Sequence, residues 1–427
     1  MATPNPSVTH SSRLVHGSPI YYGWIIMLVG ALGLIMTSPG QTYAISIFIE
    51  HFITDLGLSR SLVSTIYSAA SLLASFTLGY FGRQVDRYGS RAAAIVTTLI
   101  FGLACLFMGF VSNAWLLGLG FLALRTFGLG GLTLVSTNVI NQWWVRQRGM
   151  VMGIAGLLMS VLGLAGFPNL INWLIPIYGW QITYMILGLI LLLIMLPLAA
   201  IFLRDRPEQY GLQPDGDRPL TETGGDSPSP LNEDHWTLSE ASRTTAFWVM
   251  ALGTATIAML STGLFFHMVS IFADNSLAST VAATVYVPVA VTTAIVALSS
   301  GILVDRLPVK ILLAGALLCQ AISLVMAPYL YDVALVWLYG VILGTTFGLS
   351  RTVLNVVWAV YFGRRHLGSI TGVASTIMVI GGSLGPMPFG IGRDLLGSYS
   401  LILIISAILP LVLSVITLFV DKPLREM

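Results

Sequence analysis

The chain has 427 residues, of which 56% are apolar and 9% are charged, and its mean hydropathy is +0.86. These values exclude a soluble globular protein of this length and indicate that the lipid bilayer is the main solvent of the fold. The formal net charge of +2 gives no sign of a nucleic-acid partner, and we expect none.

Twelve apolar stretches are long enough to cross a bilayer, which takes roughly 20 residues each. Segment 1–20 is polar and Ser-rich, so we expect a cytoplasmic tail rather than a cleaved signal peptide. Residues 21–203 hold six stretches and residues 244–421 the other six, with a cytoplasmic linker at 204–243 and a cytoplasmic tail at 422–427. The expected spans are 22–49, 58–82, 92–112, 114–140, 149–172, 180–203, 244–272, 280–302, 309–328, 333–360, 368–390 and 397–420.

The basic residues are unevenly distributed between the two sides of these spans. If both termini are cytoplasmic, sixteen of the twenty Lys and Arg residues lie on that side, and Arg60 and Arg393 lie on the outer side. The positive-inside bias therefore predicts cytoplasmic termini. We expect a multi-pass protein of a prokaryotic inner membrane, and we expect a monomer. The linker 204–243 combines five prolines with acidic residues, Ser and Gly, which predicts a mobile segment.

A ten-residue pattern after the second span recurs 219 residues later, after the eighth span. The two copies contain Gly82, Asp86, Arg87, Gly89 and Arg91, and then Gly301, Asp305, Arg306, Pro308 and Lys310. The same offset relates Tyr67 to Tyr286 and Arg146 to Arg365. We therefore predict an all-α membrane protein with twelve transmembrane helices in two pseudo-symmetric halves. Such proteins bind a solute near the midplane and rock one half against the other.

The repeated loop lies where such rocking needs control. We expect its glycines to allow close helix ends and its aspartates to bond neighbouring helix termini or basic side chains. The alternative interpretation is an ordinary positive-inside loop. The predicted gating residues are Gly82, Asp86, Arg87, Arg91, Gly301, Asp305, Arg306 and Lys310.

Arg125 and Arg351 are the formal charges deep in the expected spans, and no Asp or Glu accompanies them there. A charge at the bilayer centre costs about 3 kcal/mol, so each should face the bundle interior or water. Two such arginines indicate an anionic solute. Arg351 shares a helical stripe with Gly340, Gly344, Phe347, Asn355 and Trp358, which predicts a pocket wall. Alternatively, each arginine bonds carbonyls freed near Gly or Pro and holds helices together.

Three further polar side chains are candidate solute contacts. Tyr67 and Tyr286 occupy equivalent places in the outer parts of spans two and eight, where they would form an outer gate or anchor the helices at the interface. His267 is the histidine of the seventh expected span and the side chain there that titrates near neutral pH. It is a protonation candidate, or else a polar residue at the headgroup boundary.

The repeated loop resembles the signature of the major facilitator superfamily, and the resemblance covers the whole membrane part. Arg125, Gly128, Gly130 and Gly131 resemble its second signature, which implies an arginine facing the central cavity. Other residues resemble the branch of monocarboxylate transporters and oxalate/formate antiporters. They are Trp144, Arg146, Arg148, Gly149, Gly153, Gly179, Trp180, Arg206, Pro207, Glu208, Gly211, Phe362, Arg364, Arg365, Gly368, Gly372, Gly385, Pro386, Gly392, Asp394, Gly397 and Tyr399.

At two positions this chain lacks a basic residue with which members of that branch contact their solute. Ala297 stands where the branch has an arginine, and no basic residue lies between Gly368 and Gly392, where oxalate exchangers have a lysine. The usual contacts to oxalate or lactate are therefore missing.

The sequence thus predicts a secondary active transporter of small organic anions, monocarboxylates above all, working by anion exchange or proton-linked symport. Efflux of amphipathic compounds or drugs is an alternative. A membrane receptor or scaffold that uses loop 204–243 is an alternative of another class. Cys105 and Cys319 form no metal or disulfide pattern, no phosphate-binding loop occurs, and we expect neither an enzyme nor a cofactor.

Overall fold

The computed structural model describes residues 12–216, 236–363 and 367–423. Within these ranges, the side chains of 78–80, 82–86, 298, 300–306, 355, 359 and 367–369 are outside the description. The described chain is helical throughout and contains no strand, which confirms the predicted fold class. The helices are α1 (Arg13–His16), α2 (Gly23–Met36), α3 (Thr42–Leu56), α4 (Arg60–Tyr88), α5 (Ser90–Met108), α6 (Ala114–Ala123), α7 (Thr133–Trp143), α8 (Arg148–Leu158), α9 (Phe167–Ile190), α10 (Leu196–Phe202), α11 (Leu238–Ala241), α12 (Thr245–Asp274), α13 (Ser279–Thr284), α14 (Tyr286–Arg306), α15 (Val309–Met326), α16 (Val333–Phe362), α17 (Leu367–Leu384), α18 (Pro386–Leu396) and α19 (Ser400–Leu418).

Ten helical stretches in the described residues are long and apolar enough to cross a membrane. One of them, Arg148–Phe202, has 55 residues and covers two of the predicted spans. A left-handed Gly179 with φ of 78° interrupts its helical backbone between them. The predicted second span corresponds to α4, a helix of 29 residues. The observed helices are therefore consistent with twelve spans.

The first predicted span is built of two helices with a break between them. A short 3₁₀ turn, Ser38–Gly40, separates α2 from α3, and it contains Pro39. Proline cannot donate a backbone hydrogen bond, so it disrupts a continuous helix and frees carbonyl groups. Helix α3 then continues to Leu56, seven residues beyond the predicted end at residue 49. This extension places Glu50 on an apolar helix rather than in a loop.

The described chain forms two compact units. Unit 1 contains residues 12–44, 73–167 and 173–216, and unit 2 contains residues 45–72, 168–172, 236–363 and 367–423. The units differ from the two predicted halves, because residues 45–72 of the first half pack within unit 2. The boundaries of the sequence repeat, 21–203 and 244–421, stay a prediction.

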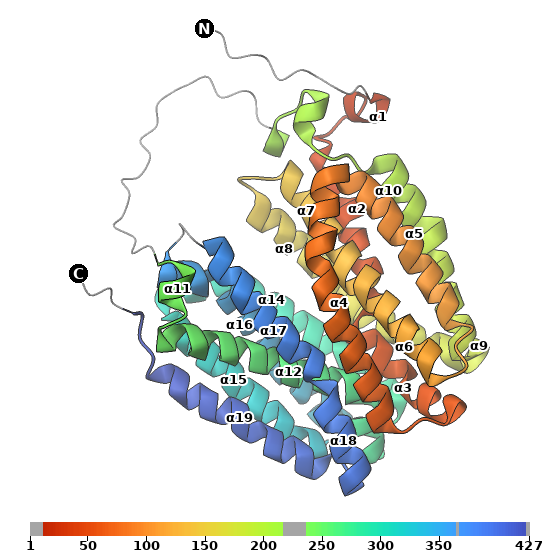
Figure 1. Ribbon diagram of the computed structural model, residues 1–427, viewed down its shortest axis with the longest axis vertical. Helices are drawn as coiled ribbons and strands as arrows, with labels where there is room; N and C mark the ends of the chain where they lie inside the picture. Colours follow the sequence, from red (N-terminus) through yellow and green to blue (C-terminus); the bar gives the residue numbers. More distant parts are fainter. Residues whose placement is uncertain (1–11, 217–235, 364–366, 424–427) are drawn as a thin grey trace. The chain divides into compact units, whose positions relative to one another are not determined.

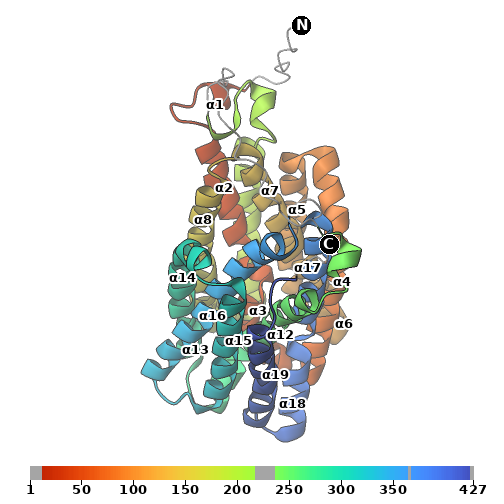
Figure 2. The same ribbon diagram turned by 90° about the vertical axis from the view of Figure 1, so that its left-hand side faces the viewer.

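Each unit has its own helix packing. In unit 1, α2 packs against α7, and α5 packs against α10. In unit 2, α12, α15 and α19 lie side by side (Figure 1), and α14 packs along α16 (Figure 2). At one end of unit 2 an apolar cluster gathers around Phe247, Trp358 and Phe362, with Trp236 at its edge.

The described ends of the predicted mobile linker are packed against helices. Arg204 is buried and donates to the carbonyls of Ile201 and Leu203. At the other end, the backbone N–H of Trp236 donates to the Phe362 carbonyl at 3.1 Å. A capping box between Thr237 and Glu240 then begins α11. The linker is thus anchored on both sides of its central segment, which lies outside the described residues.

Candidate functional site

Arg125 lies in unit 1 on a π-helical segment, Leu124–Leu132, and is 8% exposed. Its Nη1 donates to the Gly40 carbonyl at 3.2 Å and approaches Thr42 Oγ1 at 3.5 Å. Gly40 belongs to the break between α2 and α3, so the guanidinium bonds a carbonyl that the break frees from the helix. This contact favours the helix-holding alternative for Arg125. A carbonyl partner does not neutralise the charge, so the role in anion binding stays a prediction.

The glycines of the predicted pocket stripe on α16 serve helix packing. A Cβ atom on Gly340 would lie 2.5 Å from Pro288 Cγ, and one on Gly344 would lie 2.7 Å from Thr292 Cβ. Both neighbours belong to α14, so these positions have no space for a larger side chain. Arg351, farther along α16, is exposed. The glycines therefore do not line an open pocket wall beside it.

The aromatic residues of the same stripe lie in different surroundings. Phe347 stacks on Phe265, with ring centroids 5.1 Å apart and an interplanar angle of 17°. Trp358 is 2% exposed and packs against Phe247 in the apolar cluster of unit 2. The side chain of Asn355 lies outside the described residues. The packing of Trp358 favours a role in stability over solute contact.

Tyr67 and Tyr286 are both fully buried in unit 2. The Tyr67 ring lies 4.4 Å from the Phe266 ring, and the Tyr286 ring lies 5.5 Å from the Phe265 ring. The Tyr286 hydroxyl also shares a hydrogen bond of 3.1 Å with Ser46 Oγ. Two neighbouring residues of α12 thus hold both tyrosines. Their burial disfavours the interface-anchor alternative, while the outer-gate role stays a prediction.

His267 follows these two phenylalanines on α12 and has no exposed surface. Its Nε2 lies 2.9 Å from the Pro386 carbonyl, and its Nδ1 lies 2.9 Å from the Tyr399 hydroxyl. A carbonyl can only accept, so Nε2 carries a hydrogen, while the Tyr399 hydroxyl can donate to Nδ1 or accept from it. His267 therefore stays a protonation candidate. Its burial shows that His267 is held by protein contacts, and its depth in the membrane stays a prediction.

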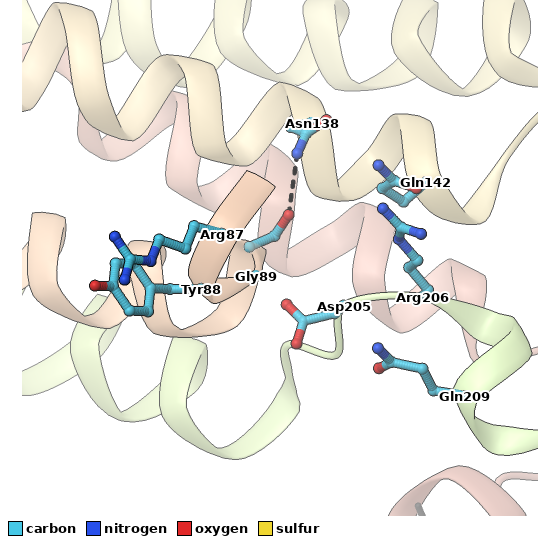
Figure 3. A pocket seen from close by; sticks show the side chains of 9 residues that line it. Arg87, Tyr88, Gly89, Asn138, Gln142, Asp205, Arg206 and Gln209 are labelled. Atoms are coloured by element: carbon cyan, nitrogen blue, oxygen red, sulfur yellow. Dashed lines mark hydrogen bonds between the residues drawn. The ribbon is translucent and has the colours of Figure 1, made fainter. Parts of the chain in front are cut away.

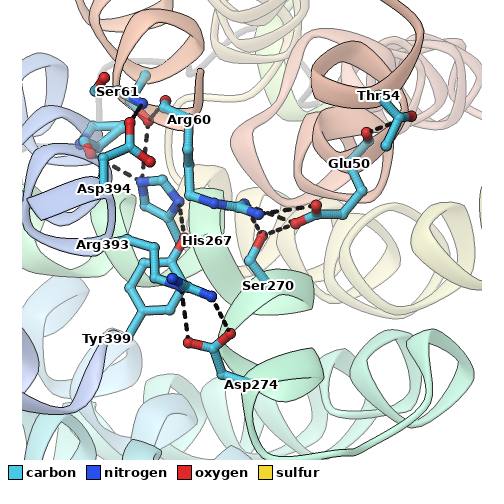
Figure 4. Close-up of polar contacts among 12 residues, drawn as sticks. Glu50, Thr54, Arg60, Ser61, His267, Ser270, Asp274, Arg393, Asp394 and Tyr399 are labelled. Carbon is cyan, nitrogen blue, oxygen red and sulfur yellow. Dashed lines mark hydrogen bonds and ion pairs between the residues drawn. The ribbon is translucent and has the colours of Figure 1, made fainter. Parts of the chain in front are cut away.

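A charged cluster that the sequence analysis missed lies beside His267 (Figure 4). The Arg60 guanidinium binds both carboxylate oxygens of Glu50, at 2.7 and 2.9 Å. Ser270 of α12 accepts from Arg60 and donates to Glu50. The predicted end of the first span at residue 49 is therefore too early, because α3 extends beyond it and carries Glu50 near its end.

Two further polar contacts complete this cluster. Arg393 of α18 pairs with Asp274 through Nε and Nη2, each at 3.0 Å. The Ser61 N–H donates to Asp394 at 2.8 Å. We call the whole set the end network, and it comprises Glu50, Arg60, Ser61, His267, Ser270, Asp274, Arg393, Asp394 and Tyr399. It joins the end of α3 and the start of α4 to α12 and α18 within unit 2, on the side predicted to face outward.

Two features of the sequence could have indicated the end network. Glu50 and Arg60 are opposite charges on either side of a short turn at Gly57, a spacing that permits an ion pair across the turn. Asp394 and Tyr399 were already part of the family resemblance. What the sequence could not show is that these segments meet, because their contacts depend on tertiary packing.

The first copy of the repeated loop is described in part. Gly89 has a left-handed φ of 85°, and a Cβ there would lie 2.6 Å from Asp205 Oδ1. Asp205 accepts the Arg91 N–H at 2.8 Å, and Arg91 Nε donates to the Ala200 carbonyl at 3.1 Å. A carboxylate at the start of α5 is favourable for the helix dipole. Asp205, which the sequence analysis missed, thus bonds this helix terminus, while the bonds expected of Asp86 and Asp305 stay a prediction.

Of the other predicted gating residues, the structure describes the side chains of Arg87 and Lys310. Arg87 is exposed, with its guanidinium 5.2 Å from the Tyr88 ring centroid. Lys310 of the second copy pairs with Asp421. The surroundings of Gly82, Asp86, Gly301, Asp305 and Arg306 are outside the description. Gating by all eight residues stays a prediction.

Asp215 fastens the linker to the start of α8 in unit 1. Its carboxylate accepts the backbone N–H groups of Val145, Arg146 and Gln147 at 3.1, 2.8 and 3.0 Å. Burial opposes its ionisation, but these three hydrogen bonds outweigh that effect and lower the pKa of Asp215 below its usual value. The residue has a left-handed φ of 61°, which Asp tolerates better than most side chains. No group of His, Cys, Asp and Glu in the described chain could hold a metal ion.

Curated relatives of this chain include named transporters and a drug-resistance protein. A multidrug resistance protein B homolog of Mycobacterium tuberculosis is 30% identical over 164 residues, which are 38% of this chain and 30% of that protein. The gentisate transporter of Corynebacterium glutamicum is 27% identical over 190 residues, or 42% and 39% of the two chains. The oxalate:formate antiporter of Oxalobacter formigenes is 24% identical over 246 residues, or 58% and 53%. The matched part of this chain spans less than two thirds of each relative.

A solved structure of similar fold is that of a bacterial homologue of the human lysosomal transporter Spinster, in an inward-facing and occupied conformation. It has a TM-score of 0.65 and 17% sequence identity, over 95% of this chain and 96% of that chain. The family model of the Major Facilitator Superfamily matches residues 30–386. This match covers most of the chain and confirms the resemblance found in the sequence. The protein is therefore a multi-pass membrane transporter that belongs to the Major Facilitator Superfamily.

Proposed function

We propose that this protein is a secondary active transporter of small organic anions, with monocarboxylates as its main substrates. The observation that carries the proposal is the presence of Arg125 and Arg351 on apolar helices. A guanidinium offers five N–H donors in a planar arrangement that suits a carboxylate. The names of two relatives support this substrate class, because gentisate, oxalate and formate are organic anions.

The proposed transport cycle alternates between states open to either side, with both chain termini in the cytoplasm. The end network supports such a cycle, since it fastens α3 and α4 of the first predicted half to α12 and α18 of the second. While these bonds hold, the predicted outer side is closed. The rocking motion has to break them before the outer side opens.

The coupling is proposed to be proton-linked symport or anion exchange. The proton route would act on Glu50, because a proton on its carboxylate removes one charge of the pair with Arg60 and weakens the end network. Arg60 stays cationic at any physiological pH. Exchange of two anions requires no such step. The two routes differ in whether a pH gradient alone drives uptake.

Drug efflux is a second candidate, which the multidrug-resistance relative favours. The two candidates differ in the substrate that stabilises the protein. A transporter of organic anions requires a carboxylate and a cation in the protein, whereas an amphipathic drug binds mainly through apolar contacts.

The test is the melting temperature of the purified protein with small carboxylates, their neutral amides and amphipathic drugs. A ligand that binds the native state raises its stability by mass action, by about 2.7 kcal/mol at a hundredfold excess over Kd. We expect carboxylates to raise Tm, the amides to have no effect, and Arg351→Ala to abolish the rise while Arg351→Lys retains part of it. Stabilisation by drugs alone, undiminished by Arg351→Ala, would refute the anion proposal. Stabilisation by neither class would refute both substrate candidates.

A further inference from the structure

Two recesses of opposite chemistry adjoin each other in unit 1. The first is a polar recess of about 390 Å³, whose lining includes Arg87, Asn138, Gln142, Arg206 and Gln209 (Figure 3). The second is an apolar groove of about 680 Å³ between α4, α5 and the segment that follows α6. Tyr88 lines both recesses. A ligand that fills them together must have a polar head and an apolar chain.

The polar recess has the chemistry of an anion site. The exposed Arg206 guanidinium lies near Gln142, and the side-chain amides of Gln142 and Gln209 add neutral donors, while the exposed Arg87 guanidinium lies apart from them beside Tyr88 (Figure 3). Asp205 also lines this recess, but its Oδ1 accepts the N–H of Arg91 at 2.8 Å. Two arginines against one aspartate leave a positive balance among these residues. Guanidinium groups match the several oxygens of a phosphate group.

The junction of the two recesses carries one of these cations. The Arg87 guanidinium lies 5.2 Å from the centroid of the Tyr88 ring. The Tyr88 side chain is 58% exposed, with its ring between the polar and the apolar parts. Tyrosine is common at membrane interfaces, where its ring contacts hydrocarbon and its hydroxyl contacts water or headgroups. The junction therefore has the chemistry of the headgroup level of a bilayer.

The apolar groove has the length of an acyl chain in one leaflet. Ala92, Val96 and Ile100 line it at four-residue intervals on α5, which places them on one face of that helix. The eight-residue separation corresponds to roughly 12 Å along the helix. One leaflet contributes roughly half of a hydrocarbon core about 30 Å thick. The groove starts beside the first turn of α5 and runs from there along the helix.

We propose that unit 1 binds an anionic glycerophospholipid, with its phosphate in the polar recess and one acyl chain in the apolar groove. The rings of Phe81 and Phe127, 5.5 Å apart and nearly perpendicular, supply aromatic contacts to that chain. The repeated loop lies at this site, so the lipid holds the end of α4 against the start of α5. Arg87 thereby acquires a lipid contact in addition to its predicted gating role.

The test uses the full-length protein in detergent with phosphatidylglycerol, phosphatidylcholine of the same chains, or glycerol 3-phosphate, and native mass spectrometry counts the bound lipids. We expect phosphatidylglycerol to be retained about tenfold better than phosphatidylcholine. Both lipids have the anionic phosphate, but the quaternary ammonium of phosphatidylcholine is repelled by the arginines of the recess, whereas the glycerol headgroup is neutral. Arg87→Gln and Arg206→Gln should each remove most of this preference. Arg13→Gln, the same charge change on α1, is the matched control and should leave it intact.

A second variant tests the apolar half separately. Val96 is 54% exposed at the groove, and Val96→Trp should fill it and weaken retention of phosphatidylglycerol. Equal retention of the two lipids, or equal loss in all three arginine variants, would overturn the proposal. Full competition by glycerol 3-phosphate at the concentration of the lipid would also overturn it, since the site would then bind a soluble phosphate without need of the groove.

Discussion

Replacement of Glu50 by Gln is expected to open the predicted outer side of the transporter. The substitution retains the shape of the side chain but removes the charge that binds Arg60 and accepts from Ser270. A hydrogen bond to a charged group contributes about 1.5–3 kcal/mol. The Glu50 side chain is 35% exposed, so solvent screening reduces the expected loss to about 1–2 kcal/mol. The equilibrium between closed and open states should shift roughly 5- to 30-fold toward the open state.

A buried cysteine placed below the end network can report this shift. Ser68 of α4 is 3% exposed, and its hydroxyl forms no hydrogen bond with the described residues, so Ser68→Cys is a mild change. A membrane-impermeant maleimide should label this cysteine roughly 5- to 30-fold faster in Glu50→Gln than in its parent. Cys319 is replaced by Ala in both proteins, while the buried Cys105 is kept as a reporter of unfolding.

Two controls distinguish opening of the outer side from unfolding of the protein as the cause of faster labelling. Asp55→Asn removes an exposed carboxylate from the same helix, α3, and should leave the labelling rate unchanged. Labelling of Cys105 should also stay slow in every variant, because opening of the outer side does not require unit 1 to unfold. Equal labelling rates at residue 68 in Glu50→Gln and its parent would refute the proposed role of the end network. Faster labelling of both cysteines would attribute the effect to unfolding.

Two further predictions concern stability. A Cβ on Gly385 would lie 2.0 Å from the Met259 backbone oxygen, so Gly385→Ala should lower the free energy of unfolding by about 1–3 kcal/mol. Gly372→Ala, in open space on α17, should leave Tm unchanged or raise it, and equal effects of the two substitutions would contradict the packing argument. Asp215→Asn should lower stability at neutral pH by about 1 kcal/mol, as loss of a helix cap does. Because the folded pKa of Asp215 is lowered, its contribution is complete above the unfolded value of about 3.9 and is lost as pH falls through the folded value. Melting curves of the two proteins should therefore converge in acid, and a gap that persists there would contradict this account.

Much of the fold could be predicted because a bilayer imposes strict requirements on a sequence. Backbone groups in hydrocarbon must be bonded within the chain, so long apolar stretches are helices. The prediction was less accurate at helix ends. A helix can continue through polar residues after the apolar stretch has ended, so the end of that stretch does not mark the end of the helix. The extension of α3 beyond residue 49 is one example, and it concealed the position of Glu50.

The candidate site was harder to predict, since periodicity places residues on a face but does not identify what covers that face. Gly340 and Gly344 share a stripe with Arg351, yet the two glycines pack against α14. Arg125 was identified correctly as a buried intramembrane cation, and its carbonyl partner at Gly40 depends on a break in another helix. The contacts of His267 likewise come from distant segments.

The central claim is transport of organic anions, and counterflow uptake into proteoliposomes tests it most directly. Vesicles loaded with an unlabelled carboxylate are diluted into a trace of the labelled compound, with formate, oxalate, benzoate and gentisate as probes and benzamide as the neutral control. We predict that at least one carboxylate accumulates, that benzamide does not, and that Arg351→Ala reduces uptake about tenfold, the loss expected for one charged hydrogen bond. Uptake of no carboxylate, or carboxylate uptake that Arg351→Ala leaves unchanged, would contradict the account.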